Sequence, residues 1–101
     1  MAKKRDPGYF LRYRYGISLL DYAHIAEQQD GRCAICRALP QSEFALAVDH
    51  DHTSGKVRGL LCMKCNRALG YLGDDPQLLL RAAEYLKAGI VQTNAVGGGE
   101  Q

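Results

Sequence analysis

The chain contains four cysteines in two pairs of equal spacing, Cys33 with Cys36 and Cys62 with Cys65. Two residues between paired cysteines allow a tight turn to direct both thiolates at one ion, and two such turns complete a tetrahedral, four-thiolate zinc site. Because four thiolates leave no open coordination position, we expect a structural rather than a catalytic ion. The alternatives are two disulfides or a redox Cys-x-x-Cys pair, and the short chain and the order of its predicted elements disfavour a thioredoxin-like redox unit.

A second group of polar residues lies between and just after the cysteine pairs, in the segment "AVDHDHTSGKVRGLLCMKCN". If zinc joins the two pairs, the intervening chain is a closed loop, in which a strand ending at Asp49-His50 can pair with residues 57–61. The helix that starts near the second pair would then bring Asn66 beside the end of the first strand. A carboxylate and a carboxamide are hard oxygen ligands, so we expect Asp49 and Asn66 to bind one Mg²⁺.

The positions of caps, turns and apolar residues predict three helices and two short strands around these groups. Ser18 is a suitable N-cap for the first helix, which Gly31 ends. Pro76, after two aspartates, suits the first position of the last helix. Side chains alternate along a strand, so His50 shares a face with its neighbour only if the first strand ends or twists there. The expected ranges are helices over 18–31, 62–72 and 76–89 and strands over 44–50 and 56–61.

Basic and aromatic residues alternate near the N-terminus, where Arg12 and Arg14 stand among three tyrosines. Such interleaving suits phosphate contact and base stacking. A solvated terminus whose tyrosines cover the core is an equally good interpretation. The formal net charge of +2 would fall to about zero with one zinc ion and four thiolates, so attraction to a polyanion must come from local patches.

The length and composition indicate one small folded domain. A chain of 101 residues with 47% hydrophobic residues suits a single core, which an internal metal ion would help to stabilise. No apolar run approaches the roughly 20 residues of a membrane span, and the N-terminus lacks the apolar region of a secretory signal. We therefore expect a cytoplasmic protein without a membrane partner. The expected organisation is a basic arm over residues 1–16, a folded domain over 17–91 and a disordered tail over 92–101.

The segment "DHDHTSGKVRGLLCMKCNRALG" resembles the HNH endonucleases, and specifically the phage recombination endonuclease VII family. The similarity covers residues 17–72 and includes the upstream segment "YGISLLDYAHIAEQQDGRCAIC". The resemblance implies a small α+β fold, a zinc-stapled ββα-metal (HNH or His-Me finger) core with flanking helices. It also implies a nuclease of a bacterial or phage-infected cell that hydrolyses DNA phosphodiester bonds with a structural Zn²⁺ and a catalytic Mg²⁺ or Mn²⁺.

The same resemblance assigns roles to individual residues. Asp49 and Asn66 would bind the catalytic ion, His50 would be the general base, and His52 would assist near the site or hold its loop by a hydrogen bond. Neutral imidazole is a suitable base near pH 7, and a cation on the phosphate offsets charge at the leaving 3′ oxygen. The zinc ligands would be Cys33, Cys36, Cys62 and Cys65.

Four basic residues are candidates for contact with the DNA backbone: Arg58 and Lys56 of the second strand, and Arg12 and Arg14 of the arm. Solvated strand charges are the alternative for both Arg58 and Lys56; we favour phosphate contact for Arg58 and a solvated charge for Lys56. Only one short helix follows the core, whereas the resolving enzyme of the family has a long helical region for dimerisation. We therefore expect nicking or weakly sequence-specific cleavage, by a monomer or a homodimer, rather than junction resolution.

Two other functions remain open on the sequence. A non-catalytic, zinc-ribbon-like nucleic-acid-binding module would explain the cysteines and the basic arm, but not the arrangement of Asp49, His50 and Asn66. A redox or chaperone zinc protein would explain the cysteines alone. RNA is a possible substrate in place of DNA.

Overall fold

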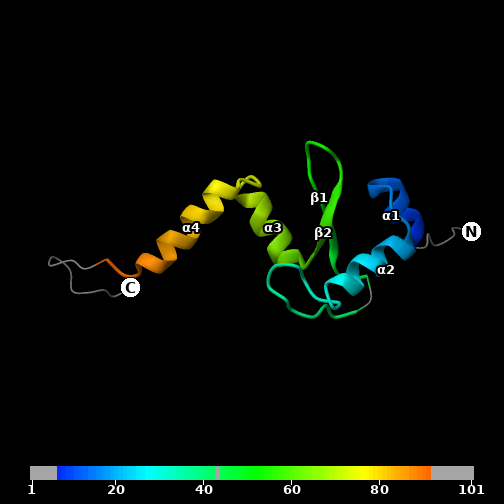
Figure 1. Cartoon of the computed structure of the whole chain (residues 1–101), viewed down its shortest axis with the longest axis horizontal. Coiled ribbons are helices and arrows are strands. Elements are labelled where there is room, and N and C mark those ends of the chain that lie inside the picture. Colours follow the sequence, from blue (N-terminus) through cyan, green and yellow to red (C-terminus); the bar gives the residue numbers. More distant parts are fainter. Residues whose placement is uncertain (1–6, 43, 92–101) are drawn as a thin grey trace, which may run out of the picture.

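The computed structural model describes residues 7–42 and 44–91. Within them the elements follow one another in the order α1 (Pro7–Tyr15), α2 (Leu19–Gln28), β1 (Ala47–His50), β2 (Val57–Leu61), α3 (Met63–Tyr71) and α4 (Pro76–Ala88), as Figure 1 shows. The protein is therefore a small α+β structure. The expected tail over 92–101 and the first six residues of the expected arm lie outside the described residues.

The second helix begins at the cap that the sequence predicts. The Ser18 hydroxyl accepts a hydrogen bond from the backbone N–H of Asp21 at 3.0 Å, and the Ser18 N–H donates to the Asp21 carboxylate at 2.9 Å. This reciprocal capping box satisfies two backbone groups that a helix start leaves unpaired, and its hydrogen bonds lower the pKa of Asp21. The helix ends at Gln28, three residues before Gly31, whose φ of 71° is in the left-handed region that favours glycine.

The two strands form an antiparallel hairpin in which Ala47 lies opposite Leu61. The first strand starts later than expected, because Phe44 has a φ of 63° that is incompatible with an extended run from residue 44. Its end is also irregular. Asp49 lies opposite Gly59, but His50 lies opposite Val57, so one residue of β2 is unmatched between them. The strand therefore continues through His50 and changes its register there, which is the feature of a β-bulge.

The last two helices have the caps expected from the sequence. The Cys62 thiol accepts from the backbone N–H of Cys65 at the start of α3. The Asp75 carboxylate accepts from the N–H of Gln77 at 2.9 Å, and Pro76 occupies the first turn of α4. Gly89, with a φ of 81°, follows the last residue of that helix.

The described part of the expected N-terminal arm is helical, which the sequence analysis did not anticipate. Leu11 of α1 is buried, and Tyr15, one turn later, packs against the core. These two positions form one face of the helix, which binds α1 to the rest of the domain. The alternation of arginine and tyrosine hides this face, because it resembles a solvated segment more than an amphipathic helix.

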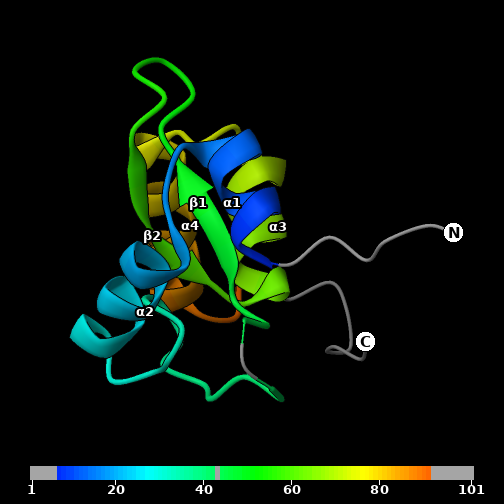
Figure 2. The same cartoon turned by 90° about the vertical axis from the view of Figure 1, so that its right-hand side faces the viewer.

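The core lies where α1, α2 and the start of α3 meet the hairpin. Gln29 joins α2 to β2, because its side chain accepts from the N–H of Leu60 and donates to the carbonyl of Leu60, both at 3.0 Å. The hairpin lies between α3 and α1 in Figure 1, and the turned view in Figure 2 has both helices beside β1. The buried residues are Leu11, Tyr22, Cys33, Leu46, Val48, Leu60, Leu61 and Cys65.

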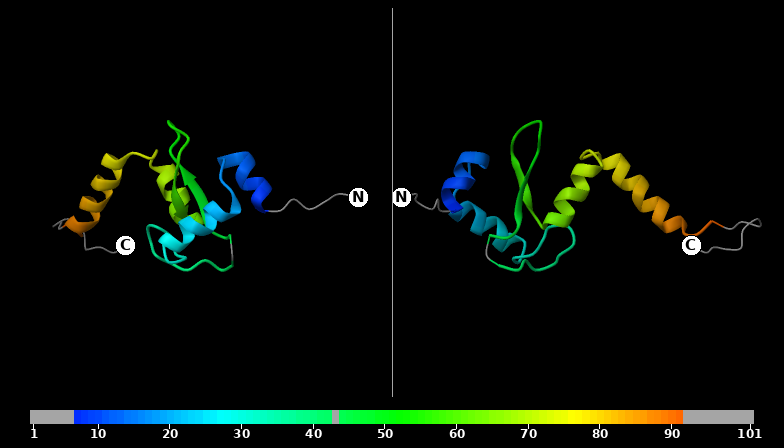
Figure 3. Two further views of the ribbon diagram at one scale, coloured as in Figure 1. Left: turned by 45° about the vertical axis from the view of Figure 1, so that its right-hand side comes forward. Right: turned by 180° about the vertical axis from the view of Figure 1, so that it is seen from behind.

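Helix α4 extends away from this core, as the two views in Figure 3 show. None of its residues is buried. Most of its large apolar side chains are exposed, and among them Leu80, Tyr85 and Leu86 are more than half accessible. The folded core therefore consists of α1, α2, the hairpin and α3.

Candidate metal centre and hairpin site

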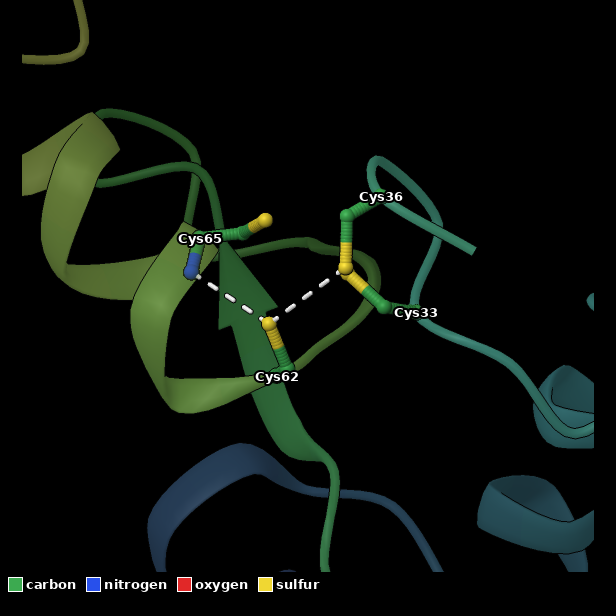
Figure 4. Close-up of side chains that lie close together, drawn as sticks. All are labelled: Cys33, Cys36, Cys62 and Cys65. Atoms are coloured by element: carbon green, nitrogen blue, oxygen red, sulfur yellow. Dashed lines mark hydrogen bonds between the residues drawn. The ribbon is translucent and has the colours of Figure 1, made fainter. Parts of the chain in front are cut away.

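The two cysteine pairs converge on one point. Cys33 and Cys36 come from the loop after α2, and Cys62 and Cys65 come from the start of α3 (Figure 4). The four Sγ atoms all lie within 4.8 Å of one another, and those of Cys36 and Cys62 are 3.8 Å apart. A tetrahedral ion with Zn–S bonds of about 2.3 Å holds its sulfurs about 3.8 Å apart. The four thiols therefore fit a zinc ion.

The thiols differ in how readily they ionise. Burial opposes ionisation of Cys33, but hydrogen bonds from the backbone of Cys62, Cys36 and Ile35 outweigh it and lower the pKa of Cys33 to about 6. Burial, followed by hydrogen bonds with the neighbouring thiols, raises the pKa of Cys65 to about 12. All four cysteines are free thiols, so disulfide pairing is excluded in this structure. A cation among them would stabilise every thiolate at once.

The hairpin carries the second candidate site, in which Asp49 is largely enclosed. The Asp49 side chain is 13% exposed and accepts two hydrogen bonds from Arg58, from Nε at 2.8 Å and from Nη2 at 3.0 Å. Arg58 is the residue of β2 that the register change leaves unmatched. The irregularity therefore brings Arg58 to the side of the strand on which Asp49 lies, where a guanidinium can bind a carboxylate with two parallel bonds.

Asp74 completes this ion-pair network from the junction of α3 and α4. Its carboxylate accepts from Arg58 Nη2 at 3.2 Å and lies 3.7 Å from His52 Nδ1. Asp74 has a φ of 56°, uncommon for a residue with a side chain. The hydrogen bonds that Arg58 donates to Asp49, then its contact with Asp74, raise the pKa of Arg58, which keeps its charge.

The two histidines of the hairpin lie side by side. The rings of His50 and His52 have centroids 4.8 Å apart, and the Tyr15 ring of α1 lies 5.7 Å from that of His50. His52 is mostly exposed and stands in the loop between the strands. Asp51 shapes that loop: its carboxylate accepts hydrogen bonds from the hydroxyl and the N–H of Ser54, which lower the pKa of Asp51.

Asn66 lies on α3 and faces a groove between α1 and β1. Its backbone N–H bonds to the carbonyl of Cys62 within the helix, and its carboxamide has no hydrogen-bond partner in the part of the chain that the structure describes. No interaction joins Asn66 to Asp49 among the described residues. The carboxamide oxygen is thus available to an external ligand.

The remaining basic candidates occupy the surface. Arg12, Arg14 and Lys56 are exposed, and none of them forms an ion pair within residues 7–42 and 44–91. The Arg14 guanidinium instead stacks over the rings of Phe10 and Tyr15, 5.6 and 5.8 Å from their centroids. These cations are therefore free of counter-charges from the described part of the protein.

Two residues of the hairpin site were not predicted from the sequence. Tyr15 belonged to the expected arm, and its contact with His50 depends on the packing of α1. Asp74 was interpreted only as part of the start of α4. One signal could have identified it: Asp75 alone caps the helix, which leaves the carboxylate of Asp74 without a helix-capping role.

A cluster of four thiols beside a hairpin with an Asp-His pair defines a small α+β protein with a candidate metal centre. The chain belongs to the recombination endonuclease VII family, whose match covers residues 9–88. This confirms the resemblance noted in the sequence and extends it on both sides, to include α1 and α4.

The chain is also similar to proteins of two mycobacterial phages. It is 47% identical over 74 residues to the Gene 59 protein of Mycobacterium phage D29, which covers 72% of this chain and 45% of the relative. It is 48% identical over 73 residues to the Gene 59 protein of Mycobacterium phage L5, with 71% and 44% coverage. The chain thus spans less than half the length of these relatives. No solved structure matches it significantly.

The cysteine cluster indicates metal binding. A search of the described residues finds no helix that is both long and apolar enough to cross a membrane.

Proposed function

We propose that the protein is a metal-dependent HNH endonuclease that hydrolyses DNA phosphodiester bonds, by nicking or with weak sequence specificity. The observation that carries this proposal is the network on the hairpin. In this member of the endonuclease VII family, a continuous chain of contacts joins five side chains: Asp49, Arg58, Asp74, His52 and His50. In the proposed ββα-metal core, β1, β2 and α3 are the three elements.

His50 is the proposed general base. A neutral imidazole takes one proton from a water molecule as that water attacks phosphorus, and the bond to the 3′ oxygen breaks. The contacts of His50 with Tyr15 and His52 fix the position of its ring between α1 and the hairpin loop. His52 is proposed to assist this proton transfer or to orient the ring.

Asp49 and Asn66 are the proposed ligands of a catalytic ion. Their oxygens are the donor type that Mg²⁺ or Mn²⁺ prefers, and such an ion supplies positive charge for the phosphate and the leaving oxygen. Arg58 uses one lone pair of each Asp49 oxygen. An ionised carboxylate offers about four acceptor positions, so the pairing with Arg58 leaves sites on Asp49 for an ion.

Arg58 is proposed to contact the phosphate as well as to hold Asp49. It uses Nε and Nη2 on the two aspartates, which leaves the other terminal nitrogen, Nη1, for a substrate oxygen. Lys56, Arg12 and Arg14 are the further proposed contacts with the DNA backbone, which would supply salt-dependent, sequence-independent affinity.

The proposed organisation keeps a basic segment over residues 1–16, a nuclease domain over 17–91 and a tail over 92–101. The proposed setting is the cytoplasm of a bacterial or phage-infected cell, with the protein acting as a monomer or a homodimer. Zinc in the four-thiol cluster has a structural role, because four thiolates fill its coordination sphere.

The test is a cleavage assay on supercoiled, linear and branched DNA with Mg²⁺, Mn²⁺, Ca²⁺ or no added ion. We expect nicked plasmid with Mg²⁺ or Mn²⁺ and none without an added ion. The Asp49→Ala variant should lose this activity while it keeps one zinc ion per chain. Purified, zinc-loaded protein that retards DNA in a gel but cuts none of the substrates with any ion would support a non-catalytic binding module instead.

A further inference from the structure

A cavity of about 390 Å³ lies between α1, the segment before β1 and the start of α3. This volume is within the range typical of small-molecule sites. Its floor is formed by buried core residues, and its rim by half-exposed aromatic and apolar side chains. The floor consists of Leu11, Tyr22, Leu46 and Val48, and the rim of Phe10, Phe44 and Met63.

The walls of the cavity suit a flat aromatic ligand. Phe10 and Phe44 are exposed to 50% and 42% and come from α1 and from the segment before β1. The ring of Tyr22 lies 5.2 Å from that of Phe44 and is held by a hydrogen bond from its hydroxyl to the Leu46 carbonyl at 2.6 Å. Its hydroxyl is therefore already satisfied, so Tyr22 offers the cavity its ring rather than a free polar group. Bases of single-stranded nucleic acids stack on such rings with little regard to sequence.

The cavity adjoins the residues that the proposed function places at the scissile phosphate. Tyr15 lines it and contacts the His50 ring, and Asn66, a proposed ion ligand, lines it from α3. The guanidinium of Arg14 lies over the rings of Phe10 and Tyr15, which places a positive charge at the rim. A nucleotide has an aromatic base and a charged phosphate. The apolar cavity suits the base, and the adjacent cation and the proposed cleavage site suit the phosphate.

We propose that this cavity binds one unstacked nucleobase of the substrate strand, next to the phosphate that is cut. The inference rests on the proposed nuclease function but concerns a separate step, the recognition of the base. Removing a base from its duplex stack costs free energy, which is smallest where the base is unpaired. The cavity thus favours DNA that has an unpaired base near the cut.

The test compares oligo(dT) with an oligonucleotide of the same length in which every residue is abasic. The two have equal numbers of phosphates, so they differ only in the bases. Binding is measured by fluorescence anisotropy, with the zinc-loaded chain of 101 residues and no added catalytic ion. We expect wild-type protein to bind oligo(dT) at least about 10-fold more tightly, from the stacking of one or more bases.

Three variants assign this preference to the cavity. Phe10→Ala removes a wall, and Ala45→Leu fills the cavity without removing an aromatic ring. Both should reduce binding of oligo(dT) about 10-fold, the loss of one stacked base, and leave binding of the abasic strand unchanged. Tyr85→Ala removes an exposed ring of α4 that does not line the cavity, and it should change neither affinity. Melting temperature and zinc content identify any variant that is misfolded.

Several results would overturn the proposal. Equal wild-type affinity for the two strands would show that no base is bound. Phe10→Ala and Ala45→Leu could lower the affinity for both strands alike, or for neither strand. Either result would show that the cavity is not the base site. Base-dependent binding by a protein that never cleaves would reject the nuclease function and retain the cavity. Cleavage without base-dependent binding would support the nuclease function and reject the cavity as a base site.

Discussion

The pairing of Arg58 with two carboxylates is the main polar feature of the hairpin. Both aspartates are largely enclosed, at 13% and 22% side-chain exposure for Asp49 and Asp74. Two anions at one guanidinium fix its plane, because Nε and Nη2 both donate to Asp49 and Nη2 also donates to Asp74. The same arrangement balances much of the negative charge at Asp49. Arg58 therefore acts as a positioning residue for Asp49.

Asp74 should affect cleavage through Arg58 and His52. The substitution Asp74→Asn removes the charge that holds both residues, and small misplacements in a site lower the turnover rate strongly. We expect kcat to fall on the order of 10-fold, with little change in KM. Asp74→Asn combined with Arg58→Gln should lower kcat by less than the product of the two single effects, because the two residues act in one network.

The adjacent aspartate provides the control. Asp75→Asn makes the same change of charge one residue away, and asparagine is as good an N-cap as aspartate. Its kcat should equal that of the wild type. If Asp74→Asn and Asp75→Asn lower kcat equally, the effect belongs to the start of α4 and the positioning role of Asp74 is wrong.

At the scale of elements, helix starts are the features that the sequence predicts best. Ser18 and Pro76 mark them correctly, because capping depends on neighbours within three residues. Helix α1 was missed, since its burial depends on a distant partner surface. The hairpin register could not be predicted either. The bulge that brings Arg58 to Asp49 depends on how the two strands meet, which no local pattern specifies.

The two best-defined caps should differ in their effect on stability. Ser18→Ala removes the capping box of α2, a helix that contributes buried Tyr22 to the core, and should lower the free energy of unfolding by about 1 kcal/mol. Asp75→Ala removes the cap of α4, which has no buried residue. It should instead increase amide exchange in α4, with a smaller change in the urea midpoint. Equal shifts of the midpoint would mean that α4 is part of the cooperative unit.

The thiol cluster should be essential to the fold, because it ties the loop after α2 to the start of α3. Structural zinc contributes on the order of 10 kcal/mol in small peptides, comparable to the whole stability of a small domain, about 5–15 kcal/mol. A chelator should therefore abolish the cooperative thermal transition, and added Zn²⁺ should restore it. Cys36→Ser should behave like the chelated protein, whereas Ala34→Ser, in the same turn, should melt like the wild type.

Zinc affinity should rise with pH. The pKa of Cys65 is raised to about 12 by burial and by its thiol neighbours, so this thiol is protonated near neutral pH and must lose its proton to bind the ion. The apparent affinity should increase by ~10-fold per pH unit for this proton alone. The pKa of Cys33 is about 6, so this thiol is protonated only in more acidic solution. Its proton therefore contributes to the pH dependence of zinc affinity only there. Competition titrations across roughly one pH unit around neutrality measure the slope, and a flat profile would argue against thiolate ligation.

At the scale of the whole molecule, the site forms where four separate parts of the chain meet. Helix α1 contributes Tyr15, and β1 contributes the Asp-His pair. Arg58 comes from β2, and Asp74 from the α3–α4 junction. The sequence indicated the ligand types because their spacing is local, as in the two cysteine pairs. It did not indicate Tyr15 or Asp74, since their roles arise only from packing. Helix α4 extends beyond this assembly (Figure 3).

The central claim is that the imidazole of His50 activates water for phosphodiester hydrolysis. The most direct test is the single-turnover rate of plasmid nicking by His50→Ala, with His24→Ala as the matched control on the exposed surface of α2. Both proteins should bind one zinc ion and melt like the wild type. The nicking rate should fall by about 10²–10⁴-fold for His50→Ala and stay unchanged for His24→Ala. Wild-type cleavage by folded, zinc-loaded His50→Ala would contradict the central claim.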